Sequence, residues 1–267
     1  MKKNKWLLAL MTLLIVAVLA ACGTGDDKED KTTGSGSDGG EQKKTLVVGT
    51  SADYAPFEFV DTAKSDEIIG FDIELIKIIG EKLGYEIKVE NMDFNSLITA
   101  LQAKQFDVVI SGMTPTEERD KVVDFSIPYY ETEQYLLFEK KKGYKDISEL
   151  KGGTVGAQTS SIQLDLAKTL AKEHGFKAES RNLIPELIQE LKAGRFDAAV
   201  IENIVSENYL SKNDDLAAFP IKVEEPDYKA IVFQEGSSLK AEFDKVIEEL
   251  IADGTIDELK EKWFVVE

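Results

Sequence analysis

The side chains best suited to chemistry lie in two loops, each of which follows a predicted strand. The residues concerned are Ser51, Asp53, Tyr54 and Glu58 in the first loop and Ser111, Thr114 and Arg119, with the backbone of Gly112, in the second. In the second loop, Pro115 and two acids favour a helical turn with Thr114 as its N-cap. Backbone N–H groups at such a turn, together with the guanidinium of Arg119, would hold a carboxylate. The alternative is that Arg119 pairs with a neighbouring acid on a solvated face.

The composition excludes several kinds of chemistry. The 267 residues include one His and one Cys, so disulfide frameworks, Cys/His zinc clusters and most nucleophile–histidine pairs are unavailable. With 50 acidic and 32 basic residues the net charge is −18, and such a surface repels nucleic-acid phosphates. We therefore expect no nucleic-acid partner, and any chemistry would have to run on carboxylates, hydroxyls, Lys or Arg.

The N-terminus has the pattern of a secretory signal. Three lysines precede an apolar stretch over residues 6–21, which ends in small residues just before Cys22. This stretch is short for a permanent spanning helix, which needs about 20 apolar residues. Residues 19–22, Leu-Ala-Ala-Cys, resemble the lipobox of bacterial lipoproteins. That resemblance implies a signal peptide over residues 1–21 and acylation of Cys22, palmitate included, which would anchor the protein at the extracytoplasmic face of a Gram-positive cell membrane.

The segment after Cys22 is too polar to join a folded core. Residues 23–44 contain no aliphatic or aromatic side chain and are rich in glycine and charge. We expect residues 22–44 to form a disordered tether.

From residue 45 onward, short apolar strands alternate with amphipathic helices, which is typical of α/β folds with mostly parallel sheets. Strands are predicted at residues 45–49, 86–90 and 107–110, with helices at 72–83 and 95–104. The same order restarts with strands at residues 154–157, 177–181 and 197–201 and helices at 161–174 and 185–193. The C-terminal part adds a strand at residues 230–234 and helices at 238–252 and 255–263.

One segment of this pattern is repeated closely. Residues 97–107 match residues 187–197 at six of eleven positions. Helix–turn–strand units can look alike through shared patterning, but the common order of elements favours two lobes of one architecture. Open α/β sheets bind ligands beyond the carboxyl ends of their strands, so a cleft between two such lobes is the expected site.

Several separate segments resemble, in order, the polar amino-acid-binding proteins of ABC importers, solute-binding protein family 3. They are residues 49–59, 70–72, 111–119, 123–130, 150–156 and 254–264. The resemblance implies an α/β fold of the periplasmic-binding-protein-like type II class, a two-lobed clamshell with mixed, mostly parallel sheets. The two hinge crossings would fall near residues 131–135 and 222–227. Lobe 1 would comprise residues 45–133 and 224–267, and lobe 2 residues 134–223.

The resemblance also implies roles for individual residues. Arg119 would hold the α-carboxylate of an amino acid, helped by Thr114 and by the backbone N–H groups of Ser161 and Ile162. The α-ammonium would meet the Gly112 carbonyl, Thr114 and Glu202. Tyr54 and Phe94 would enclose the ligand side chain, whose end group nearby polar residues would read: Ser51, Asp53, Glu58 and Gln158, with Ser111 beside them.

Three positions depart from the family pattern. Many members have Asp where Glu202 stands, Thr where Ile162 stands, and, when the ligand is basic, Asp where Ser51 stands. Asp53 could supply that missing charge if its side chain points inward.

The function that the resemblance implies is capture of an amino acid by a monomeric lipoprotein that delivers it to the permease and ATPase of an ABC importer. It implies no catalytic residues, no metal and no cofactor. An arginine- or lysine-type ligand is favoured, with glutamine, another polar amino acid or cystine as alternatives. Two further alternatives are a cyclohexadienyl-dehydratase-like enzyme on the same fold and a sensor that binds without transport.

Overall fold

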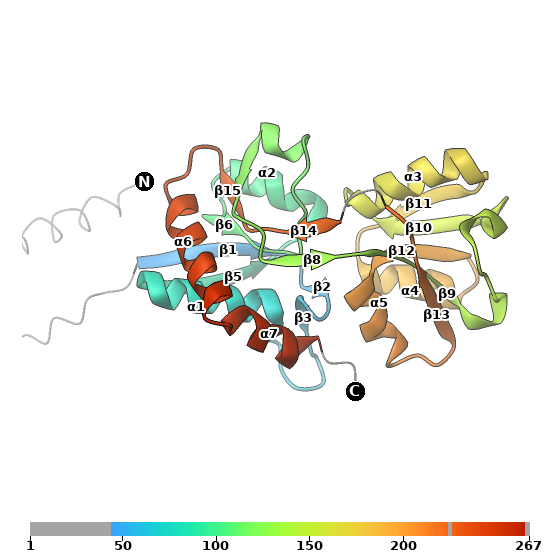
Figure 1. Cartoon of the computed structure of the whole chain (residues 1–267), viewed down its shortest axis with the longest axis horizontal. Coiled ribbons are helices and arrows are strands. Elements are labelled where there is room, and N and C mark those ends of the chain that lie inside the picture. Colours follow the sequence, from blue (N-terminus) through green and yellow to red (C-terminus); the bar gives the residue numbers. More distant parts are fainter. Residues whose placement is uncertain (1–43, 224–225, 265–267) are drawn as a thin grey trace, which may run out of the picture. The chain divides into compact units, whose positions relative to one another are not determined.

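The computed structural model describes residues 44–223 and 226–264 (Figure 1). The predicted signal peptide, Cys22 and residues 23–43 of the tether lie outside the described residues. Lys44, which we expected at the end of the tether, begins strand β1.

Lobe 1 is built on a five-stranded sheet. Its order is β5 (Tyr85–Asn91), β1 (Lys44–Thr50), β6 (Val108–Val109), β15 (Val232–Gln234) and β7 (Val123–Phe125). Only β15 runs against the other four strands. Helices α1 (Phe71–Leu83), α6 (Leu239–Ala252) and α7 (Thr255–Trp263) pack together on one face, and α2 (Leu97–Gln102) packs on the other.

Lobe 2 repeats this arrangement. Its sheet has the order β11 (Lys177–Arg181), β10 (Thr154–Gln158), β12 (Ala198–Glu202), β9 (Gln134–Glu139) and β13 (Leu216–Pro220), and only β9 is reversed. Helix α3 (Ile162–His174) covers one face, and α4 (Ile184–Lys192) and α5 (Asn203–Leu210) cover the other. The expected α/β fold, with two lobes and mixed, mostly parallel sheets, is confirmed.

Smaller elements connect and edge the lobes. Strands β8 (Tyr130–Thr132) and β14 (Asp227–Lys229) pair with each other and run between the two large sheets (Figure 1). Strands β2 (Asp53–Tyr54), β3 (Glu58–Val60) and β4 (Ile68–Ile69) form a small separate sheet. The 3₁₀ segments are η1 (Phe94–Ser96), η2 (Arg119–Lys121), η3 (Lys140–Lys142) and η4 (Ile147–Leu150).

One local prediction is wrong in its position. The helical turn begins at Glu117 rather than at Pro115, and Thr114 is not its N-cap. The backbone is instead held by Arg119, whose Nη1 donates to the Thr114 carbonyl at 2.6 Å. The cap-like acceptor is Thr116, whose Oγ1 lies 3.2 Å from the Arg119 backbone nitrogen at the start of η2.

The repeated Phe-Asp pair has the same packing role in both lobes. A Cβ on Gly49 would lie 2.4 Å from the Phe106 ring, and one on Gly156 would lie 2.4 Å from the Phe196 ring. The adjoining carboxylates also match, since Asp107 Oδ2 and Asp197 Oδ2 each accept a backbone N–H of the neighbouring strand, at 2.8 and 2.9 Å. The repeat seen in the sequence therefore reflects one packing solution used twice.

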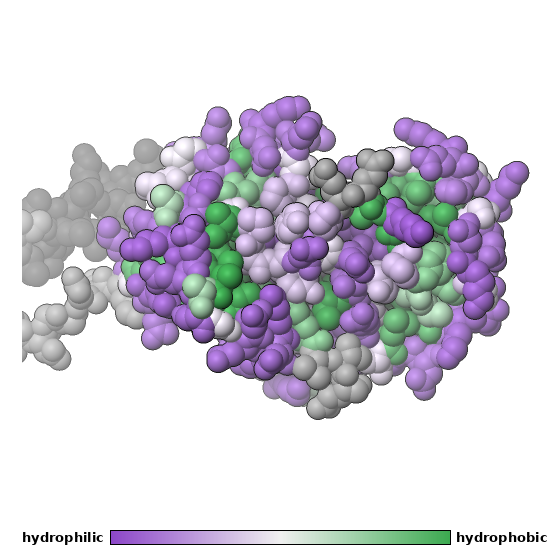
Figure 2. Space-filling view, in the orientation of Figure 1, coloured by the Kyte–Doolittle hydropathy of each residue, from purple (hydrophilic) through white to green (hydrophobic). Residues whose placement is uncertain are grey.

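Hydrophilic side chains cover most of the rim of the face shown in Figure 2, as the charged composition leads us to expect. Among the residues that the structure describes, no helix is both long and apolar enough to cross a membrane.

The contact between Gly156 and Phe196 predicts the effect of a substitution. Gly156→Ala should lower the free energy of unfolding by about 1–3 kcal/mol, because the new methyl group overpacks a buried ring. Urea unfolding measures this loss. In a Phe196→Leu background, where the ring is gone, the same substitution should cost less. An equal cost in both backgrounds would show that the ring is not the obstacle.

Candidate functional site

A pocket of about 330 Å³, including the solvent at its mouth, lies between loops of the two lobes. Every residue that the sequence analysis assigned to the site lines it: Ser51, Asp53, Tyr54, Glu58, Phe94, Ser111, Gly112, Thr114, Arg119, Gln158, Ser161, Ile162 and Glu202. Two residues that sequence reasoning missed, Gln163 and Lys229, line it as well.

Arg119 brings a desolvated cation to this pocket. Its Nη1 and Nη2 donate to the carbonyls of Thr114 and Ser160, at 2.6 and 2.9 Å, and its guanidinium carbon lies 5.5 Å from the centre of the Phe94 ring. Burial lowers the pKa of Arg119 to about 10, which leaves it protonated at neutral pH. Among the described residues, the arginines that form ion pairs are Arg181 and Arg195. Within the described residues Arg119 forms no ion pair, so the alternative in which it pairs with a neighbouring acid is wrong.

A helix N-terminus lies beside this cation. Helix α3 has 13 residues, and its N-cap Ser161 and first residue Ile162 line the pocket. The carbonyl that Arg119 contacts, that of Ser160, directly precedes the cap. Free N–H groups and the helix dipole make such an end favourable for anions. Arg119 and α3 together form an anion-binding corner.

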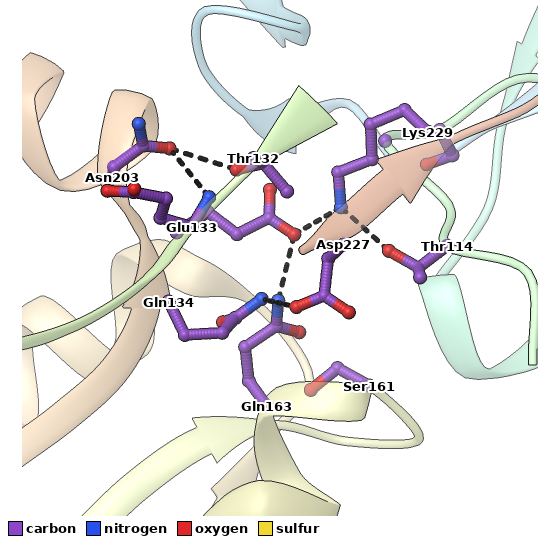
Figure 3. A network of polar contacts seen from close by, with 12 residues as sticks. Thr114, Thr132, Glu133, Gln134, Ser161, Gln163, Asn203, Asp227 and Lys229 are labelled. Carbon is purple, nitrogen blue, oxygen red and sulfur yellow. Dashed lines mark hydrogen bonds and ion pairs between the residues drawn. The ribbon is translucent and has the colours of Figure 1, made fainter. Parts of the chain in front are cut away.

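Glu202 and Lys229 form a buried ion pair in the same pocket. Glu202 ends strand β12 and Lys229 ends strand β14, with relative exposures of 0% and 1%. Glu202 Oε1 accepts from Lys229 Nζ and, at 2.9 Å, from Gln163 Nε2. Lys229 Nζ also donates to Thr114 Oγ1 at 3.1 Å (Figure 3). Glu202 Oε2 is buried without a hydrogen-bond partner among the described residues.

Lys229 was missed because a lysine is usually exposed and because its strand has only three residues. The available signal was its place directly before the apolar run 230–233, which marks it as a residue near a strand end. Gln163 gave a weaker signal, from its place in the first turn of α3.

Asp53 links the two lobes. Its Oδ2 accepts the backbone N–H of Ile184, at the start of α4, at 2.7 Å and the amide of Gln158 at 3.3 Å, while Oδ1 accepts the Ser51 hydroxyl at 2.7 Å. Burial raises the pKa of Asp53 although these hydrogen bonds act to lower it. The carboxylate that we expected to read a ligand end group is therefore already engaged by lobe 2.

Two buried acids, Glu58 in the pocket lining and Asp72 behind it, hold the loops of the pocket. Glu58 Oε1 accepts the Ser111 hydroxyl at 2.8 Å, and Asp72 Oδ2 accepts the Gly112 backbone N–H at 2.8 Å. The Tyr129 hydroxyl donates to Asp72 at 2.9 Å. Burial raises the pKa of Glu58 well above its usual range and that of Asp72 to about 6.

Gly112 stands where the structure favours glycine. Its φ of +46° is one that other residues rarely adopt, and a Cβ there would lie 3.0 Å from the Tyr54 ring. Tyr54, in turn, stacks on Phe57 with ring centres 5.8 Å apart. Among the described residues, no group of three or more His, Cys, Asp and Glu side chains could hold a metal ion.

Comparison with known proteins places this pocket in context. The family model of the bacterial extracellular solute-binding proteins, family 3, matches residues 46–266. The arginine-binding extracellular protein ArtP of Bacillus subtilis is 49% identical over 267 residues, which cover 99% of each chain.

Two solved structures are also similar. The amino acid ABC transporter substrate-binding protein AbpA of Streptococcus pneumoniae, bound to L-arginine, is 36% identical with a TM-score of 0.78, covering 83% of this chain and 95% of that one. An ancestral arginine-binding protein bound to glutamine is 40% identical with a TM-score of 0.77, covering 82% and 97%. These relatives are binding proteins, which supports the expectation that the chain is not an enzyme and argues against the dehydratase alternative.

The raised pKa of Asp72 predicts a pH effect on stability. A carboxyl with a pKa of 3.8 before folding and about 6 after it takes up a proton on folding. The stability linked to that proton is present below pH 3.8 and is lost as the pH rises through 6. The Asp72→Asn variant has no carboxyl at this position and does not lose this stability. The free energy of unfolding of the variant minus that of wild type should therefore increase by up to about 3 kcal/mol between pH 4 and pH 7.

Urea unfolding at several pH values measures this difference. Asp66→Asn, at an exposed position, controls for the loss of one charge. Parallel pH profiles for wild type and Asp72→Asn would contradict the prediction, whatever their constant offset.

Proposed function

The chain belongs to family 3 of the bacterial extracellular solute-binding proteins, and we propose that it captures an amino acid, arginine before lysine, for delivery to an ABC importer. The observation that carries this proposal is the half-buried guanidinium of Arg119, which has no carboxylate among its hydrogen-bond partners in the described residues. Burying a charge without a counter-ion is costly, so a ligand carboxylate at this position gains both attraction and hydrogen bonds.

Arginine is favoured for the other end of the ligand by two considerations. The pocket offers the carboxylate of Asp53 and the ring of Tyr54, and both groups attract a guanidinium. ArtP, which is 49% identical, is named as arginine-binding, and AbpA is described as bound to L-arginine.

Glutamine is the second candidate. A protein 40% identical to this chain is described as bound to glutamine. The engagement of Asp53 by Ile184 and Gln158 also favours a neutral end group, because these donors already use much of the carboxylate.

Delivery requires that the protein stay near its importer. We propose that residues 1–21 are a signal peptide, that Cys22 carries the lipid anchor, and that the folded part works as a monomer at the extracytoplasmic face of a Gram-positive membrane. The lipobox-like sequence at residues 19–22 and the polar tether behind it support this arrangement.

Arg119→Ala should weaken arginine binding by about 30-fold or more, since truncating one partner of a buried, hydrogen-bonded charge pair costs about 2–5 kcal/mol. Titration calorimetry measures the affinity, and a thermal-shift screen of the twenty amino acids with ornithine and cystine identifies the ligand. The fold should persist, because Arg119 forms no ion pair in the described part of the chain.

Arg181→Ala is the matched control. Arg181 also lies over a phenylalanine ring, 4.7 Å from the centre of Phe196, but it is outside the pocket, so its loss should leave affinity unchanged. Unchanged affinity in Arg119→Ala would refute the assignment of the carboxylate site. A largest thermal shift with glutamine would favour the second candidate.

Cys22→Ala should release the protein from the membrane, because it removes the thiol that would carry the acyl chains. Cell fractionation and detergent partitioning of the full chain in a Gram-positive host measure this change. Thr24→Ala, two residues further along, should fractionate as wild type does. Membrane retention of the Cys22→Ala variant would contradict the anchor.

A further inference from the structure

Lys229 places a second cation in the pocket, beside the one that the proposed function uses. Its Nζ donates to Thr114 Oγ1 at 3.1 Å, while Arg119 Nη1 donates to the carbonyl of the same threonine at 2.6 Å. The two positive groups therefore meet at a single residue. Lys229 is 1% exposed, and Figure 3 shows its side chain directed from β14 toward Thr114.

An amino acid bound through its carboxylate at Arg119 would bring its α-ammonium to this same place. The carboxylate and the α-ammonium are separated by one carbon atom, so the ammonium would lie near the Thr114 side chain. Of the three acceptors expected for this ammonium, the Gly112 carbonyl, Thr114 Oγ1 and Glu202, the ammonium of Lys229 already contacts the last two.

The Lys229 ammonium and a ligand α-ammonium would compete for the carboxylate of Glu202. Glu202 Oε1 accepts from Lys229 and from Gln163, which leaves Oε2 as the oxygen without a partner in the described residues. An α-ammonium at Oε2 would place two like charges around one carboxylate, and such charges repel strongly away from water. The attraction that Glu202 offers to a ligand ammonium is thus largely cancelled inside the protein.

We propose that the side-chain ammonium of Lys229 occupies the position in which the α-ammonium of a ligand would otherwise bind. The pocket therefore accepts carboxylates with or without an α-amino group. This inference rests on the proposed function, since it assumes that the ligand carboxylate binds at Arg119. It widens the substrate class to amino acids together with their desamino analogues, among them ω-guanidino carboxylates, and it makes Lys229 the residue that sets this tolerance.

The test is a cycle of two ligands and two proteins, measured by titration calorimetry. The ligands are arginine and guanidinopentanoate, which is arginine without its α-amino group, and the proteins are wild type and Lys229→Met. Wild type should bind the two ligands within about tenfold of each other. Lys229→Met leaves Glu202 free to bind the α-ammonium of arginine. The preference of this variant for arginine over guanidinopentanoate should therefore be at least about tenfold larger than that of wild type.

Three further variants control the cycle. Lys229→Gln removes the charge but keeps hydrogen-bonding groups, and it serves if Lys229→Met does not fold by circular dichroism. Lys262→Met breaks a lysine–glutamate pair outside the pocket, with Glu74, and should change neither affinity. In the double variant Glu202→Gln, Lys229→Met, the gained preference for arginine should disappear, because it acts through Glu202.

Each pattern of results decides between the two proposals. The role of Lys229 is overturned if wild type prefers arginine over guanidinopentanoate by more than tenfold, or if this preference is not larger in Lys229→Met. Either result leaves the proposal of amino-acid binding intact. Binding of guanidinopentanoate without binding of any amino acid overturns the proposed function and also the tolerance of an α-amino group. If glutamine is the ligand, the same cycle applies with glutamine and its desamino analogue, and if neither class of ligand binds, both proposals fail.

Discussion

Two cations, the buried Lys229 and the half-buried Arg119, meet at Thr114, and both contact the opposite lobe. Arg119 donates to the carbonyl of this residue and reaches across to Ser160 of lobe 2. Lys229 donates to its hydroxyl and pairs with Glu202, also of lobe 2. Buried charge is tolerated only where it is compensated, so both cations draw negative or polar groups of the opposite lobe toward them. Lys229 finds a carboxylate within the described chain, and Arg119 finds only carbonyls.

The two lobes supply rigid walls for this arrangement. Each sheet ends its central parallel strands at the pocket, and each packs a phenylalanine ring against a glycine of the neighbouring strand, Phe106 on Gly49 and Phe196 on Gly156. Between these walls lie polar contacts, such as that of Asp53 with the first N–H of α4, and apolar contacts, since buried residues of both lobes share one hydrophobic cluster.

The sequence predicted long, periodic elements well because their burial pattern is local. Strand β11 and helix α7 have the predicted boundaries, and the site residues drawn from the family resemblance all line one pocket. Strands β8 and β14 were missed, since each has three residues and is stabilised by pairing with the other across almost one hundred positions. The helical turn was predicted to begin after Thr114 from capping preferences, but Thr116 is the threonine whose hydroxyl accepts the backbone N–H of Arg119. Lys229 could not be recognised as buried until its partner Glu202 was placed beside it.

We expect a ligand carboxylate to bind at Arg119 while Lys229 stays paired with Glu202. A high-resolution crystal structure of the arginine complex would show both contacts at once. Two carboxylate oxygens should lie within hydrogen-bond distance of the Arg119 guanidinium and the N-terminus of α3, with Lys229 Nζ still in contact with Glu202 and Thr114. A ligand whose carboxylate lies away from Arg119, or whose α-ammonium has replaced a displaced Lys229 between Glu202 and Thr114, would contradict this expectation.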